Sequence, residues 1–152
     1  MKKMIAFLLL AVLALFLKGK LPLSFDEFDN VERVVIVSKT RIDDCDNCIE
    51  NGDDFYCVFE GENVKNILDN IQEQEEIKGV NLYFSKDTKL SYFQEKLDYL
   101  SDKSQIDDVE IYYGYYKGYQ DFEWLEGKKI NVQLARVEDG WIMGFPMILT
   151  GF

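Results

Sequence analysis

Hydrophobic and polar positions divide the chain into an apolar leader and a longer region of mixed pattern. Residues 4–17 are apolar without interruption and follow Lys2 and Lys3. As a helix this stretch would rise about 21 Å, less than the roughly 30 Å hydrocarbon core of a bilayer. A charged start before a short apolar stretch is typical of an export signal. The pattern predicts that residues 1–20 form a signal peptide or, because no small-residue cleavage site follows Leu17, a retained signal anchor.

The region after the leader begins with a predicted hairpin. Residues 21–30 are polar and aromatic and are interpreted as a connector. Residues 31–37 are β-branched and apolar, which favours a partly buried strand, and residues 55–59 are the expected return strand. The loop between them is acidic and contains Cys45 and Cys48, and the third cysteine, Cys57, lies on the return strand. We therefore expect one folded domain over residues 31–152.

Two helical patterns follow. Apolar residues between positions 64 and 71 recur at helical spacing, which predicts a first helix that Asn63 caps and Gly79 closes. Residues 80–85 alternate as in a strand with one buried face. The second helix is expected to begin near residue 87, and its apolar stripe consists of Leu90, Phe93, Leu97 and Leu100.

The last third of the chain alternates again. Strands are predicted over residues 109–116, 129–137 and 141–149, with an Asp-Gly hairpin turn at residues 138–140. Pro146 cannot donate a ladder hydrogen bond, so the last strand is expected at an edge or with a bulge. This order of elements predicts the α+β class, with an antiparallel sheet and two helices packed on one face.

The three cysteines are the first candidates for chemistry. Outside the cell, a disulfide between Cys57 and either Cys45 or Cys48 is the favoured expectation. The Cys45-x-x-Cys48 spacing invites a redox interpretation, but neighbouring aspartates raise thiol pKa values, whereas oxidoreductases need them lowered. A structural zinc site would need a carboxylate as its fourth ligand because the chain has no histidine. We therefore predict neither a metal nor a cofactor.

The same loop holds six carboxylates between residues 43 and 54, which makes it the candidate for calcium. The EF-hand template fails there, since the position that requires glycine is Ile49 when the count starts at Asp44. A calcium-responsive or redox-responsive module centred on this loop stays an alternative.

Charge limits the partners. The formal net charge is −11, and residues 1–20 contribute four lysines and no acid, so the rest of the chain is four units more negative. Such a surface repels nucleic-acid phosphate and anionic lipid headgroups. We expect no nucleic-acid partner, and contact with the membrane only through residues 4–17.

Tyrosines in the strand at residues 109–116 suggest a binding surface. Tyr112 and Tyr116 share a strand face with Gly114, and exposed rings there would form a flat platform for a sugar ring, which Trp124 would extend. Tyrosines in strands also pack half-buried with the hydroxyl in water, and that alternative remains open.

No residue set in the sequence forms a recognisable catalytic constellation. Without histidine, the Ser-His and Cys-His schemes are excluded. A carboxylate-dependent envelope hydrolase is one alternative, with Glu110, Glu123 and Glu126 as first candidates. The preferred hypothesis is a non-enzymatic domain, on the extracellular face of the membrane or secreted, that binds an envelope protein or wall component.

The closing hairpin carries a resemblance. Residues 130–136 (Ile-Asn-Val-Gln-Leu-Ala-Arg) and 144–148 (Gly-Phe-Pro-Met-Ile) resemble the C-terminal signature of the YwmB family of exported proteins, and the order of elements from residue 80 onward is similar. The resemblance implies a fold like the TATA-box-binding protein, and export in a Gram-positive bacterium. It carries over no catalytic residue and no DNA binding, because fold does not imply function. The chain is shorter than the family, has Phe145 where a small polar residue is usual, and adds the cysteine loop.

Overall fold

The computed structural model describes residues 24–151 apart from residues 75 and 120. The predicted signal or anchor, residues 1–20, lies outside this part of the chain. Within the part described, none of the helices combines the length and the apolar character that a membrane crossing requires.

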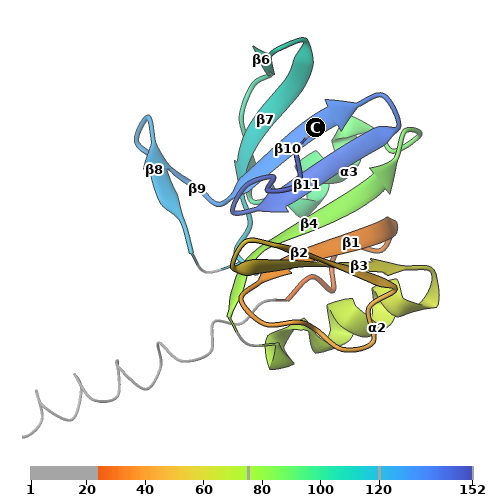
Figure 1. The fold of residues 1–152 in the computed structure, drawn as a ribbon. Coiled ribbons are helices and arrows are strands. Elements are labelled where there is room, and N and C mark those ends of the chain that lie inside the picture. Colours follow the sequence, from red (N-terminus) through yellow and green to blue (C-terminus); the bar gives the residue numbers. More distant parts are fainter. Residues whose placement is uncertain (1–23, 75, 120, 152) are drawn as a thin grey trace, which may run out of the picture.

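The fold is an antiparallel sheet with two α-helices, as the α+β prediction stated. Figure 1 shows the arrangement. The helices are α2 (Glu62–Asn70) and α3 (Leu90–Lys96), and a short 3₁₀ turn, η1 (Ile71–Glu73), follows α2. The first four strands are β1 (Val31–Ser38), β2 (Asn47–Asn51), β3 (Asp54–Glu60) and β4 (Ile77–Ser85). The others are β5 (Tyr99–Leu100), β6 (Ser104–Ile106), β7 (Val109–Tyr115), β8 (Glu123–Leu125), β9 (Lys128–Ile130), β10 (Val132–Val137) and β11 (Gly140–Phe145).

Nine of these strands form one sheet in the order β2-β3-β1-β4-β11-β10-β7-β5, with β6 also paired to β7. Strands β8 and β9 form a separate two-stranded sheet. The chain therefore places β2 and its neighbour β3 at one end of the large sheet, and β7 near the other end.

The core follows from the period-two pattern of the central strands. Leu82 on β4 lies directly opposite Val34 on β1 and Met143 on β11, and all three are buried. Residues that are directly paired across strands point to the same face of a sheet. The buried side chains of α2 and α3, including Ile67 and Phe93, belong to the same hydrophobic cluster as these strand residues.

The helix boundaries differ from the prediction. The first helix begins after Gly61 and ends at Asn70, and Gly79 is a strand residue inside β4. A Cβ at Gly79 would lie 2.6 Å from Leu149 Cδ1 and 3.1 Å from the Phe145 carbonyl oxygen, so this glycine lies in a closely packed part of β4 and not at a helix end. The second helix is shorter than expected, because Leu100 pairs with Gly114 as part of β5.

The predicted connector is partly core. Phe25 and Phe28 are buried, and their rings pack on Phe145 at centroid distances of 4.9 and 6.0 Å. Tyr92 on α3 donates its hydroxyl proton to Asp29 Oδ1 at 2.9 Å. The folded domain thus includes residues 24–30, because aromatic side chains in that segment fill the space beside the sheet.

The predicted tight hairpin at residues 138–140 is confirmed, with Val137 opposite Gly140, although its two turn residues are Glu138 and Asp139 and Gly140 is the first residue of β11. The prediction that the last strand lies at an edge is wrong, since β11 lies between β4 and β10. Pro146 needs no edge because β11 has already ended at Phe145. The residues after it lie against the sheet, where Ile148 N–H donates to Gln133 Oε1 at 3.0 Å.

Candidate functional site

The two predicted platform tyrosines are buried. Tyr112 is 7% exposed and Tyr116 is 2% exposed, so the exposed platform that the sequence suggested is not formed. Tyr112 lies directly opposite Leu134, on the core face of the sheet, and the Tyr116 hydroxyl donates to the Ser24 carbonyl at 2.8 Å. Burial raises the pKa of the Tyr116 hydroxyl above its ordinary value. Both residues therefore belong to the core.

Trp124, the third predicted member of that surface, is 65% exposed. It lies on β8, whose hairpin with β9 stands apart from the large sheet (Figure 1). Every residue from 121 to 129 is exposed. Phe122 and Leu125 are 40% and 46% exposed, so three large apolar side chains face water within four residues. We call residues 121–130 the aromatic hairpin.

The turn of the aromatic hairpin explains how so short a ribbon forms. Glu126 and Gly127 connect Leu125 to Lys128, which are directly paired. Their φ angles are 50° and 79°, and a two-residue hairpin turn of type I′ requires positive φ at both central positions. Glycine adopts this conformation without steric cost. The Glu-Gly pair is a weaker sequence signal than Asn-Gly or Asp-Gly, and the hairpin was not predicted.

The exposed rings of Phe122 and Trp124 contact each other and a neighbouring lysine. The Phe122 and Trp124 rings meet edge to face, with centroids 5.8 Å apart and planes at 87°. Lys129 Nζ lies 4.4 Å from the centre of the Phe122 ring and 5.9 Å from that of Trp124. An ammonium group over an aromatic face is attracted by the ring quadrupole. The surface that results is apolar, with a cation at its side.

Asn131 fixes the base of the aromatic hairpin to the body. Its N–H donates to the Gly114 carbonyl at 2.9 Å, and its side-chain Oδ1 accepts from Tyr116 N–H at 2.8 Å. Its Nδ2 donates to the carbonyls of Tyr116 (2.9 Å) and Tyr119 (2.5 Å). Because this amide is buried and fully bonded, it interrupts the predicted strand over residues 129–137 and separates β9 from β10.

The three cysteines converge at the opposite end of the sheet. Cys48 on β2 lies directly across from Cys57 on β3, and their Sγ atoms are 3.0 Å apart. All three Sγ atoms, including that of Cys45, lie within 4.8 Å of one another. The thiols are free in this structure, so the predicted disulfide of Cys57 stays a prediction. Strand β2, which brings Cys48 to Cys57, was not expected from the sequence.

Burial governs the acidity of two of these thiols, those of Cys57 and Cys45. Desolvation raises the pKa of Cys57 to about 12, and burial also raises the pKa of Cys45. The Ile42 N–H donates to Cys57 Sγ at 3.4 Å. Protonated thiols are poor nucleophiles, so neither Cys57 nor Cys45 has the lowered pKa that thiol oxidoreductases use.

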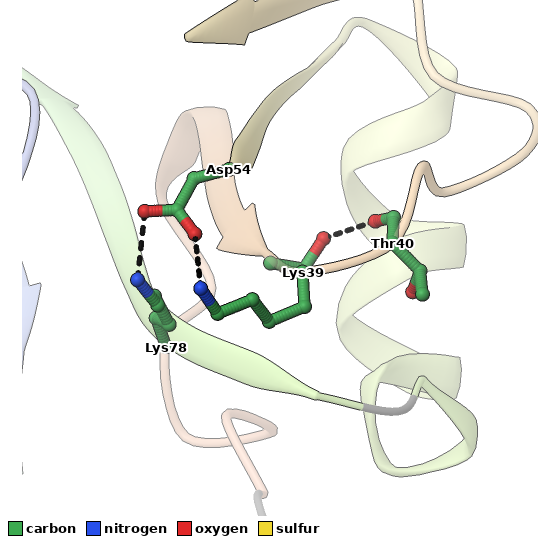
Figure 2. Close-up of polar contacts among 5 residues, drawn as sticks. Lys39, Thr40, Asp54 and Lys78 are labelled. Carbon is green, nitrogen blue, oxygen red and sulfur yellow. Dashed lines mark hydrogen bonds and ion pairs between the residues drawn. The ribbon is translucent and has the colours of Figure 1, made fainter. Parts of the chain in front are cut away.

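Protein groups already engage two of the loop carboxylates. Asp54 lies between two lysines, with its Oδ1 3.3 Å from Lys39 Nζ and its Oδ2 2.8 Å from Lys78 Nζ (Figure 2). Asp46 accepts from Glu60 N–H at 2.7 Å and from Asn63 Nδ2 at 3.0 Å. In the part of the chain that the structure describes, the three cysteines are the side chains close enough to one another to hold one metal ion, and no carboxylate lies among them.

Comparison of the chain with protein-family models, with curated proteins and with solved structures gave no match. The candidate sites are therefore interpreted from their own geometry.

Proposed function

We propose that this chain is an exported, non-enzymatic cell-envelope domain that binds a partner protein through the aromatic hairpin. The observation that carries the proposal is the exposure of Phe122, Trp124 and Leu125 on one projecting ribbon. Contiguous apolar patches on a protein surface mark interaction sites, and tryptophan is the residue most enriched in binding hot spots. Export is supported by the pattern of residues 1–20.

The charge of the aromatic hairpin favours a protein over a lipid surface. Asp121, Glu123 and Glu126 alternate with the apolar residues, and Lys128 and Lys129 only partly offset them. Anionic headgroups repel such carboxylates, whereas a pocket on a protein can pair each of them while it buries the rings. The partner surface that fits is an apolar pocket with basic groups at its rim.

The position of the two helices leaves the aromatic hairpin accessible to a partner. We propose that α2 and α3 pack on one face of the sheet, because their buried residues share a cluster with the strand side chains that point to one face. Layered packing of this kind is expected of an α+β domain. The aromatic hairpin leaves this layer beside β7 and is not covered by either helix (Figure 1).

The hydrolase alternative receives no specific support. Glu110 lies on β7 with its carboxylate 3.8 Å from Lys103 Nζ, while Glu123 and Glu126 are exposed on the aromatic hairpin. A hollow of about 730 Å³ has four exposed carboxylates at its wall, those of Glu32, Glu60, Glu138 and Asp139. An acid–base pair needs an apolar setting for one carboxyl.

Photocrosslinking from the aromatic hairpin tests the binding proposal. The full chain is expressed in its source cell with a photoreactive amino acid at Leu125, and adducts in the envelope fraction are identified by mass spectrometry. The proposal expects one discrete protein adduct that is lost in the Trp124→Ala variant and kept in Ile106→Ala. Ile106 is the matched control because it is 42% exposed on another strand, β6. Adducts that are diffuse, or equal in both variants, would contradict the proposal.

Export is tested separately. External protease is added to intact cells that express the full chain or a variant with Leu9 and Leu10 replaced by arginine. Two charges in the apolar stretch are expected to abolish recognition as an export signal. The proposal expects degradation of the parent chain and protection of the variant; protection of both would contradict export.

A further inference from the structure

The convergence of three cysteines points to a metal site that lies on other elements than the aromatic hairpin and does not depend on it. We propose that the Sγ atoms of Cys45, Cys48 and Cys57 bind one monovalent copper ion in a three-coordinate thiolate site. A disulfide would use two of these sulfurs and leave the third without a role. All three lie within 4.8 Å of one another, and they come from β2, β3 and the loop before β2.

The spacing of the sulfurs suits a single ion. With a metal–sulfur bond of about 2.3 Å, three sulfurs around one ion in a plane lie about 4 Å apart. The Sγ atoms of Cys48 and Cys57 are 3.0 Å apart, so their rotamers need to open by roughly 1 Å to admit the ion. Cys48 belongs to an edge strand and is partly exposed, which leaves its side chain free to make this adjustment.

The type and number of ligands select the metal. Thiolate sulfur is a soft ligand and favours Cu(I) and Zn(II) among biological cations. Structural zinc is almost always four-coordinate, and no carboxylate joins the three cysteines in the part of the chain that is described. Both carboxylate oxygens of Asp46 already accept hydrogen bonds from Glu60 and Asn63. A three-sulfur set therefore matches Cu(I) better than Zn(II).

The surroundings provide both entry and shelter. Cys45 and Cys48 are partly exposed, whereas Cys57 is fully buried beside Ile42 and Phe59. Asp43 and Asp44 are exposed nearby on the loop and attract cations toward it. An ion that enters from the loop side would meet water on one side and the hydrophobic core on the other.

The binding step is balanced without a redox reaction. Copper enters as Cu(I), three S–H bonds are broken, three copper–sulfur bonds form, and the thiol protons pass to the buffer. The metal keeps its oxidation state and no electron is transferred. Because deprotonation accompanies binding, affinity is expected to rise with pH.

The test is a titration of the reduced full-length chain in detergent with Cu(I), in ascorbate and in competition with the chromophoric chelator bicinchoninate. The proposal expects one Cu(I) to be withdrawn from the chelator per chain, with new near-ultraviolet absorption from copper–thiolate bonds. Cys45→Ser should weaken binding more than about 100-fold, beyond the 10–100-fold cost of a lost outer-shell contact. Cys45 is the first target because it is partly exposed and lies in the loop before β2, whereas Cys57 is buried in the core.

A matched control isolates the ligands from the local charge. Asp44 has a φ of 62°, a conformation that asparagine also tolerates, so Asp44→Asn removes a charge and keeps the loop backbone. This variant should weaken Cu(I) binding less than about fivefold, as expected for an exposed charge. Cys48→Ser, with its fold checked by circular dichroism, supplies a second ligand variant.

Three outcomes would overturn the copper assignment. The first is a reduced chain that withdraws no Cu(I) from the chelator. The second is stoichiometric binding that Cys45→Ser leaves unchanged. The third is uptake of Zn(II) from a zinc chelator by a chain that fails to compete for Cu(I), which would assign the cluster to zinc with a further ligand.

Discussion

Asn131 shows how one buried amide decides the course of a whole segment. Its side chain accepts from one backbone N–H and donates to two carbonyls, and all three partners lie between Tyr116 and Tyr119. Buried polar groups are tolerated only when their hydrogen bonds are made. The bonds of Asn131 therefore hold the chain that leads from β7 into the aromatic hairpin against the chain that leaves it.

Loss of this amide should be costly. Asn131→Ala leaves the Tyr116 N–H and the Tyr119 carbonyl without partners, whereas the Tyr116 carbonyl still accepts from Tyr119 N–H. Each unpartnered buried group costs about 1–3 kcal/mol. We expect the free energy of unfolding to fall by about 2–4 kcal/mol in urea denaturation, allowing for partial hydration of the freed groups. Asn51→Ala, at an exposed position on β2, should change it by less than about 0.5 kcal/mol. Equal effects of the two substitutions would refute the role of Asn131.

Asp54 gives a prediction for pH. The lysines beside it lower the pKa of its carboxyl below the ordinary value, chiefly through the hydrogen bond from Lys78. The unfolded chain therefore takes up the proton first as the pH falls. The stabilisation is present above the unfolded-state pKa and is lost as the pH falls through the folded-state pKa.

Asp54→Asn should lower the melting temperature at neutral pH, and the difference from the parent chain should shrink as the pH falls below about 4. Asp107→Asn is the matched control, because Asp107 is exposed and its φ of 48° suits asparagine. The control is expected to differ little from the parent at either pH. A difference at Asp54 that does not change with pH would argue against ion pairing with Lys39 and Lys78.

At the scale of elements, the aromatic hairpin is an appendage of the domain. Strands β8 and β9 pair only with each other in the part described, and the cation–π contact of Lys128 with Tyr99, at 4.2 Å, joins the hairpin to the body. Exposed contacts of this kind contribute about 0.5–1 kcal/mol. Replacement of residues 122–129 by a short Gly-Ser link should therefore change the free energy of unfolding by less than about 1 kcal/mol.

This replacement is measured by chemical denaturation of the domain. Retained stability together with lost binding to isolated envelopes would show that the hairpin serves binding and not folding. Unfolding of the replaced chain would mean that the hairpin belongs to the core of the fold.

The segment after β11 packs so closely on the sheet that it requires a glycine at residue 144. A Cβ at Gly144 would lie 2.3 Å from the carbonyl carbon of Met147, which is backbone and cannot move aside alone. Gly144→Ala should displace residues 147–150 from the sheet and lower the free energy of unfolding by about 1–3 kcal/mol. The amide N–H of Ile148 should then exchange faster with solvent, because its bond to Gln133 is lost. Unchanged exchange at Ile148 would contradict this packing.

The elements that the sequence predicted correctly are those with a strong local pattern. β1 and β3 are apolar runs, and the β10–β11 turn has an Asp-Gly signal. β2, β5 and β8 are too short to show a clear alternation of apolar and polar residues. They are strands because they pair with other segments, and their own residues do not indicate that pairing. In β7, aromatic residues occupy both faces, so the pattern could not say which face is buried. The choice is made by contacts distant in sequence, such as Tyr116 with Ser24.

The same reasoning applies to the candidate sites. The sequence identified Trp124 and the three cysteines as residues of interest, but it grouped Trp124 with two tyrosines that are core residues. It also did not bring all three sulfurs together, because this needs the pairing of β2 with β3. Spacing along the chain can predict which side chains are close only within one element or one turn.

At the scale of the molecule, an acidic domain presents two separate surfaces of different chemistry. The cysteine cluster lies at the β2–β3 end of the large sheet. The aromatic hairpin projects from the other end of that sheet, beside β7. The net charge of −11 favours partners with basic surfaces and disfavours nucleic acid. Binding to the proposed partner should therefore weaken with salt if basic groups line the pocket, since exposed charge pairs are screened.

Binding through the aromatic hairpin is tested most directly by the affinity of the domain without residues 1–20 for envelopes isolated from its source cell, measured by co-sedimentation. If the aromatic hairpin is the binding surface, binding is saturable, Trp124→Ala weakens it about 30-fold, as expected for loss of a hot spot of about 2 kcal/mol, and Ile106→Ala leaves it unchanged. Absence of saturable binding, or equal affinity of the two variants, would contradict the assignment of the aromatic hairpin as a binding surface.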